Sequence, residues 1–143
     1  MTLTAERKTD RWVGSGFDFP PQYYAMGDDI IYKGGLVVLN SDGYAEAGST
    51  AADHNQCVGV AIETVDNAGG SNGDKSVHAQ AGVWHFGNSA SSDEITVDDI
   101  GAVCYVVDDE TVAKTSDSNA RSAAGKVMGV DANGVWVLVG AHV

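Results

Sequence analysis

Four histidines are the residues of this chain best suited to acid–base chemistry or metal binding. His54 lies in a predicted loop, and His142 stands next to the C-terminus. His78 and His85 fall in one predicted strand at an odd spacing, so they face opposite sides unless a bulge at Gly82 realigns them. The chain has no His-Glu-x-x-His or Cys-x-x-Cys spacing. We therefore expect no metal site.

Cysteines and acidic clusters are the next candidates for chemistry. Cys57 and Cys104 are too few for a disulfide framework, and each lies in an apolar run that is typical of a strand. We expect two buried, reduced thiols that pack as small hydrophobic side chains. The acidic clusters lack the spaced oxygen ligands of a calcium loop, so we interpret them as solvated turns. They are Asp28-Asp29, Asp93-Glu94, Asp98-Asp99 and Asp108-Asp109-Glu110.

Two patterns that often mark active sites are incomplete or missing. The Gly-Gly-Ser-Asn-Gly run at 69–73 lacks the Lys-Ser/Thr pair and the following helix of a phosphate-binding loop, and we interpret it as a flexible hairpin tip. The sequence contains no Gly-x-Ser-x-Gly nucleophile motif. Paired carboxylates on distant strands are the one enzymatic arrangement that spacing leaves open. We predict that the protein is not an enzyme and uses no cofactor.

The elements that would position these residues are short β-strands separated by Gly and Asx turns. A single helical turn is predicted at 96–100, with Thr96 as N-cap and Asp99 three residues later. The predicted fold class is all-β: a small barrel or sandwich of short antiparallel strands, with an extended N-terminal arm and at most one or two short helical turns. The predicted strands are 36–39, 44–47, 58–65, 76–86, 103–107, 111–113, 127–130 and 135–139.

Strand periodicity predicts which side chains are buried. In 76–86, Val77, Ala79, Ala81 and Val83 share one face, and His78, Gln80 and Trp84 share the other. The strand 135–139 is apolar on both faces, which is typical of a strand covered on both sides by the core or by a subunit interface. A weak internal repeat, in which 35–39 leads to 57–60 and 101–107 leads to 127–130, favours a pseudo-symmetric barrel.

The 143 residues fit one domain in two chemically different parts. Residues 1–33 carry five acidic and four basic residues, whereas 34–143 carries fifteen acidic and four basic residues. Adjacent prolines, Pro20 and Pro21, argue against regular structure near them. We predict an extended arm over 1–33, wrapped on its own chain or on a neighbour, and a β-body over 34–143. The arm concentrates the aromatic residues that we take as interface candidates: Trp12, Phe17, Phe19, Tyr23 and Tyr24.

The overall charge and hydropathy exclude some partners. A formal net charge of -12 argues against a nucleic-acid partner, which requires a basic surface. No apolar stretch is long enough to span a membrane, and the N-terminus lacks an apolar leader, so we expect synthesis in a cytoplasm and no membrane partner.

An ordered series of short motifs resembles a known family. From about residue 34 to 140, the chain reads Gly59-Val-Ala, a Gly-rich loop, Gly82-Val-Trp, Thr96-Val-Asp-Asp-Ile-Gly, Val107-Asp-Asp, Ala124-Gly-Lys-Val and Gly134-Val-Trp-Val. This series is similar to the small capsid decoration, or cement, proteins of tailed bacteriophages. The N-terminal segment is the part least like that family.

The resemblance implies a structural role on a phage head. It implies a protein that binds the outer capsid surface, contacts the major capsid protein, self-associates as a homotrimer and stabilises the coat lattice without catalytic residues. We expect the aromatic arm to make these contacts, so that deletion of residues 1–24 leaves a folded domain that no longer binds capsids. The alternatives are another virion β-domain of a tail tube or baseplate, and a carbohydrate-binding module with Trp84 and Trp136 as a sugar platform.

Overall fold

The computed structural model describes residues 2–12, 19–51 and 54–140. In this part of the chain the regular elements are strands and two short 3₁₀ turns, so the predicted all-β class is confirmed. The strands are Gln22–Ala25 (β1), Ile30–Ile31 (β2), Leu36–Asn40 (β3), Ala45–Ala47 (β4), His54–Ala61 (β5), Val65–Asp66 (β6), Ser76–Gln80 (β7), Gly82–Asn88 (β8), Val103–Val106 (β9), Thr111–Ala113 (β10), Ala123–Asp131 (β11) and Gly134–Val139 (β12). The 3₁₀ turns are Ser91–Asp93 (η1) and Val97–Asp99 (η2).

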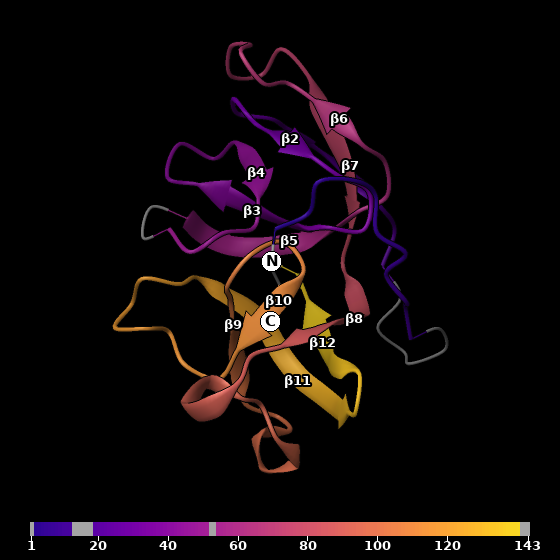
Figure 1. The fold of residues 1–143 in the computed structure, drawn as a ribbon. Coiled ribbons are helices and arrows are strands. Elements are labelled where there is room, and N and C mark those ends of the chain that lie inside the picture. The colour runs from indigo at the N-terminus through magenta and orange to yellow at the C-terminus, as the bar shows by residue number, and fades with distance from the viewer. Residues whose placement is uncertain (1, 13–18, 52–53, 141–143) are drawn as a thin grey trace.

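Strands β8 to β12 close into a small barrel, seen in the lower half of Figure 1. The strand order is β11-β12-β8-β10-β9, and β9 pairs again with β11 to complete the ring. The pairs are antiparallel except for β8 with β10. The side chains that fill the barrel are mainly valines with one large ring. They include Phe86, Ile95, Cys104, Val106, Val112, Ala124, Val127, Val135 and Val137.

The first half of the chain builds a second ring in the upper part of Figure 1. Here the order is β1-β7-β5-β3-β4, and a parallel bridge between Met26 and Ala45 connects the end of β1 back to β4. The small β2–β6 pair lies beside it. This first barrel has its own core, which comprises Met26, Ile31, Val37, Ala45, Val58, Ala61, Val77 and Ala79, with Tyr24 and Leu39 packed against it.

The two barrels have the same connectivity and the same register. The strands β1, β3, β4, β5 and β7 correspond in chain order to β8, β9, β10, β11 and β12. The closing bridge of Met26 with Ala45 corresponds to the parallel pair of Asn88 with Val112. Each barrel also has a register shift beside a glycine on its longest strand, Gly59 in β5 and Gly125 in β11. The chain is therefore a tandem duplication of one five-stranded unit.

Backbone hydrogen bonds before β3 and β9 fix the correspondence residue by residue. Gly34 donates to Ala61, and Ala61 donates to Gly35. In the second barrel Gly101 donates to Val127, and Val127 donates to Ala102. Gly34 and Gly101 both have φ of +91°, a conformation that favours glycine. The predicted internal repeat is thus present but larger than expected. Its final motif lies at 123–126, which matches 57–60, rather than at 127–130.

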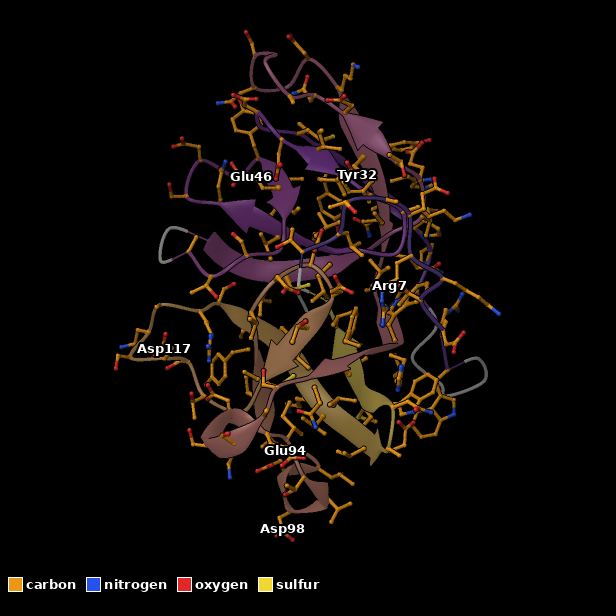
Figure 2. All side chains as sticks on the ribbon, viewed as in Figure 1. Arg7, Tyr32, Glu46, Glu94, Asp98 and Asp117 are labelled. Atoms are coloured by element: carbon orange, nitrogen blue, oxygen red, sulfur yellow. The ribbon has the colours of Figure 1, made fainter. Side chains whose placement is uncertain are left out.

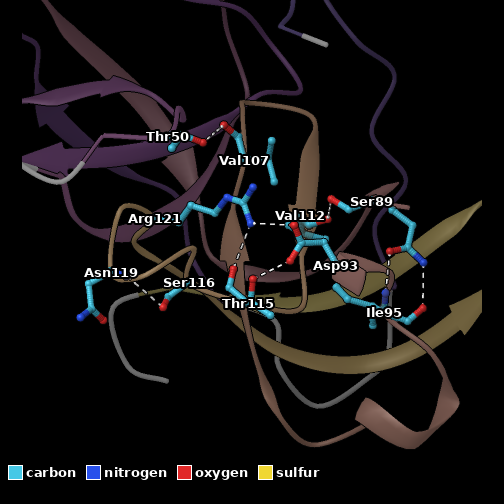
Figure 3. Close-up of polar contacts among 11 residues, drawn as sticks. Thr50, Ser89, Asp93, Ile95, Val107, Val112, Thr115, Ser116, Asn119 and Arg121 are labelled. Carbon is cyan, nitrogen blue, oxygen red and sulfur yellow. Dashed lines mark hydrogen bonds and ion pairs between the residues drawn. The ribbon is translucent and has the colours of Figure 1, made fainter. Parts of the chain in front are cut away.

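The outer face of the first barrel packs against the second barrel. Four side chains of the first barrel point away from it and join the core of the second barrel: Leu36, Val38, Cys57 and Val60. Leu36 donates its N–H to the carbonyl of Asp109 at 2.9 Å in the β9–β10 turn. Thr50 Oγ1 donates to Val107 O at 2.9 Å in the same region (Figure 3). A parallel pairing of β5 with β11 completes the contact.

The observed strands differ from the predicted ones at several places. β5 begins at His54, which was predicted to lie in a loop, and β11 begins at Ala123 rather than at residue 127. Residues 22–25 and 30–31, which were predicted to lie in the arm, form β1 and β2 of the first barrel. The run 58–65 ends at Ala61, and Val65 starts a separate short strand. The predicted strand 76–86 breaks at Ala81, where it passes from one barrel to the other. This break reverses the alternation, so the prediction that Trp84 lies on the polar face is wrong.

The predicted helical turn is present as η2. The Asp99 carboxylate accepts a hydrogen bond from the Thr96 N–H at 2.8 Å, which satisfies a donor at the start of the turn. Arg121 holds the long connection from β10 to β11 in place. Its Nη1 lies 3.3 Å from Asp93 Oδ2 and donates to Thr115 O at 3.2 Å (Figure 3). The Thr115 hydroxyl and Arg121 together lower the pKa of Asp93.

Candidate binding surface

An exposed ring pair marks the first barrel. Tyr23 on β1 stacks on His78 of β7, with ring centroids 4.2 Å apart and planes within 6°. The Tyr23 side chain is 68% exposed, the highest value among the large apolar or aromatic residues described. Cross-strand pairing of the two residues places the rings side by side. Tyr23 therefore presents an exposed aromatic surface.

The corresponding positions of the second barrel also carry a ring pair. His85 on β8 pairs with Trp136 on β12, with centroids 4.8 Å apart. Asp131 connects the two rings, because one carboxylate oxygen lies 3.3 Å from His85 Nε2 and the other accepts from Trp136 Nε1 at 3.1 Å. The backbone N–H of Asn133 and these two contacts lower the pKa of Asp131. The carboxylate therefore stays ionised and fixes the orientation of the indole.

The arm adds a third ring to this pair. Arg11 forms an antiparallel bridge with Trp84, and Trp12 donates its N–H to Val83 O at 2.8 Å. These bonds place the Trp12 ring 6.0 Å from that of Trp136, edge to face, and leave Trp12 45% exposed. The two indoles border a hollow of about 400 Å³, which is also lined by Arg11, Gly129, Val130 and Asp131.

Several polar contacts hold the described part of the arm on its own chain, and those of Arg7 and Leu3 are among them. Arg7 donates to Thr9 Oγ1 at 2.8 Å and to His85 O at 2.9 Å, and its guanidinium lies over the Phe86 ring. Figure 2 shows Arg7 between the arm and the body. Closer to the N-terminus, Leu3 donates its N–H to the buried Asp109 carboxylate at 2.8 Å. The interpretation of 108–110 as a solvated turn is therefore wrong for Asp108 and Asp109, which are 8% and 1% exposed. Burial raises the pKa of Asp109 to about 6, and burial lowers the pKa of Arg7.

The other predicted interface residues are placed differently. Phe19 is partly buried, and its carbonyl accepts a hydrogen bond from Gln80 Nε2 at 2.6 Å. Tyr24 packs against the core of the first barrel. Phe17 lies outside the described residues. Of the five candidates, the structure therefore shows two, Trp12 and Tyr23, on the surface.

A second apolar surface was not recognised in the sequence. Val97, Ile100 and Val103 are 65%, 52% and 42% exposed, and they follow one another from η2 into β9. Figure 2 places Asp98 in this region, at the end of the second barrel. The sequence could have indicated this surface, because a helical turn of three residues is too short to bury both Val97 and Ile100. We call Val97, Ile100 and Val103 the β9 patch.

The groups considered for chemistry are not arranged as a reactive site in the described residues. Cys57 and Cys104 are free and buried, and desolvation raises the pKa of each to about 12. His78 and His85 belong to separate ring pairs, so the break at Ala81 does not bring them together. No group of three or more histidine, cysteine or acidic side chains in the described ranges is spaced to hold a metal ion. His142 lies outside those ranges.

Comparison of the chain with protein-family models, with curated proteins and with solved structures found no match. Among the described residues, no helix has the length and apolar character needed to cross a membrane.

Proposed function

We propose that this protein is a structural virion component that binds the outer surface of a tailed-phage capsid and stabilises the coat-protein lattice. Its partner is the major capsid protein, and it self-associates as a homotrimer. It is made in the host cytoplasm and ends on the outer capsid surface, without a nucleic-acid or membrane partner. It acts as a binding protein rather than an enzyme. A protein that binds only the mature lattice adds to its stability by mass action, and many copies make modest contacts collectively large.

The observation that carries the proposal is the pair of exposed aromatic residues on the N-terminal segment. Tyr23 and Trp12 stay accessible although each already packs on a ring of its own chain. Exposed aromatic rings held in fixed orientations are frequent anchors of protein interfaces. The acidic body supports the same role, because it keeps the protein soluble and away from the phage's own DNA. The motif order over 34–140 supplies the capsid as the target.

The test is to mix purified protein with expanded, undecorated capsids and to image them by cryo-electron microscopy. We expect regular extra density on the outer surface and a higher melting temperature of the shell. Point variants are better than the deletion of residues 1–24, which would remove most of β1. The double variant Trp12→Ala and Tyr23→Ala should bind capsids with an affinity lower by about tenfold or more, which is seen as lower occupancy of the outer-surface density. The control Asp117→Ala changes an exposed residue on a distant loop (Figure 2) and should bind normally.

The outcomes of this experiment separate two failures. Bare capsids with the wild-type protein would refute the capsid role as a whole. Full occupancy by the double variant would leave the capsid role standing and refute the part given to the aromatic residues.

One observation favours a second candidate, a carbohydrate-binding module. The hollow beside Trp12 and Trp136 combines indole rings with Arg11 and Asp131, which are residue types that contact sugars. The alternative platform of Trp84 with Trp136 is not available, because Trp84 is only 8% exposed and belongs to the core. A shift of tryptophan fluorescence on addition of glycans, abolished by Trp136→Ala, would favour this function. An unchanged spectrum would count against it.

A further inference from the structure

The tandem duplication identifies a surface that one barrel has covered and the other has left open. In the first barrel the outer face carries Leu36, Val38 and Val60, all of them buried under the second barrel. By register, the corresponding residues of the second barrel are Val103, Tyr105 and Lys126. Val103 is 42% exposed, Tyr105 is half-buried and Lys126 is exposed. The same structural face is thus an interface in one unit and free surface in the other.

The segment that lies next to this face is also covered in only one barrel. At Gly34 the arm packs so closely that an added Cβ would lie 2.0 Å from the Arg7 carbonyl oxygen. At the corresponding Gly101 nothing lies within 4 Å of such an atom. The adjacent Ile100 and Val97 are among the most exposed apolar side chains described. The uncovered face therefore extends from β9 and β11 across the whole β9 patch.

The chain itself contains a turn equivalent to the one that covers this face in the first barrel. In the first barrel the cover is the β9–β10 turn, where Asp109 O accepts from Leu36 N–H and Val107 O accepts from Thr50. By register, the corresponding turn of the first barrel is the β3–β4 turn, with Asp42 at the position of Asp109. Residues 41–43 are exposed. The turn that would be the cover and the face that would be covered are therefore both free on the same molecule.

We propose that the β9 patch, together with Tyr105 and Lys126, is the self-association surface of this protein, covered by the β3–β4 turn of a second copy. The contact repeats between molecules the packing that joins the two barrels within one molecule. Charge supports a second copy, since Lys126 replaces the apolar Val60 and the β3–β4 turn brings the acidic Asp42. Such a contact is head-to-tail, and head-to-tail contacts close into rings when the rotation permits.

The test is the mass of the purified full-length protein, measured without capsids by sedimentation velocity over a wide range of concentration. We expect the wild type to form a discrete oligomer that dissociates on dilution. Val103→Asp puts a charge into the apolar contact and should weaken association by at least about tenfold. Ser76→Asp is the matched control, because it puts the same charge on an exposed strand position of the other barrel. It should leave the mass unchanged.

A charge exchange tests the head-to-tail arrangement itself. Lys126→Asp and Asp42→Lys should each weaken association by about fivefold, and the double variant should recover most of the loss. All four substituted positions are exposed, so circular dichroism and the melting temperature are expected to match the wild type. A wild type that stays monomeric, a Val103→Asp protein that associates normally, or a double variant without recovery would each overturn the proposal. The proposal rests on the self-association stated in the proposed function, and because no capsid is present, its failure is distinct from a failure to bind capsids.

Discussion

Gly125 offers a sharp test of the barrel geometry. A Cβ at this position would lie 1.9 Å from the Leu138 carbonyl oxygen on the neighbouring strand, and the backbone has φ of +158°. Gly125→Ala must therefore move β11 away from β12 where Gly125 pairs with Val139. Overpacking and an unfavourable backbone each cost about 1–3 kcal/mol, so we expect a loss of about 3 kcal/mol in the free energy of unfolding.

Gly129 on the same strand is the matched control. The nearest atom to its added Cβ is Trp136 Cδ1 at 3.5 Å, an ordinary contact. Gly129→Ala should therefore stay within about 0.5 kcal/mol of the wild type. The assay is urea unfolding followed by tryptophan fluorescence, with melting temperature as a second measure. The Gly125→Ala loss corresponds to a decrease of roughly 10 °C.

The duplication extends this prediction to the first barrel. An added Cβ at Gly59 would lie 2.6 Å from Gln80 backbone atoms, so Gly59→Ala should cost about as much as Gly125→Ala, again about 3 kcal/mol. Equal losses for Gly125→Ala and Gly129→Ala would refute the steric reasoning. A neutral Gly59→Ala would refute the equivalence of the two bulges.

Three further predictions concern single groups. Burial raises the pKa of Asp109 from 3.8 to about 6, so the folded state binds its proton first and this group adds stability as the pH falls from about 6 to about 4. The free energy of unfolding of Asp109→Asn, measured by urea titration, should thus exceed that of the wild type by about 2 kcal/mol above pH 6. This difference should disappear near pH 4. A difference that stays constant with pH would contradict this reasoning. Cys57 and Cys104 should react with a thiol reagent only after denaturant is added, because burial raises the pKa of both thiols to about 12. Rapid labelling of the native protein would disprove their burial. In thermal unfolding, Trp84→Ala should lower the free energy of unfolding by about 3–5 kcal/mol and Trp12→Ala by less than about 1 kcal/mol, because only Trp84 is a core residue. Similar losses for the two variants would contradict the assignment of Trp84 to the core.

The sequence predicted the strands wherever local signals were sufficient. The hairpins around Gly43 and Gly134 and the turn at Thr96 are found where alternation and turn residues placed them. Prediction failed where tertiary pairing decides the structure. Residues 22–25 follow two prolines and show no periodicity, yet β7 pairs with them along their full length. Similarly, the break at Ala81 depends on the passage between two barrels, which no local pattern records.

The candidate surfaces divide in the same way. Composition identified the aromatic arm, but burial separates Trp12 and Tyr23 from Tyr24, and burial depends on the closure of the first barrel. The β9 patch could be recognised only after Val103 was matched to the buried Leu36. That match rests on the pairing of strands far apart in the chain. The weak repeat was visible in the sequence, but its correct register required the positions of Gly59 and Gly125 in the two sheets.

The arrangement of the two barrels along the chain has a consequence for folding during synthesis. The strands of the first barrel all lie before residue 81, and those of the second all lie after it. The first barrel can therefore assemble from contacts that are close in sequence while the second is still being translated. Until then Leu36 and Val38, which the finished protein buries, remain open to solvent. A nascent chain paused near the middle therefore exposes apolar side chains that can associate with other chains until the second barrel covers them.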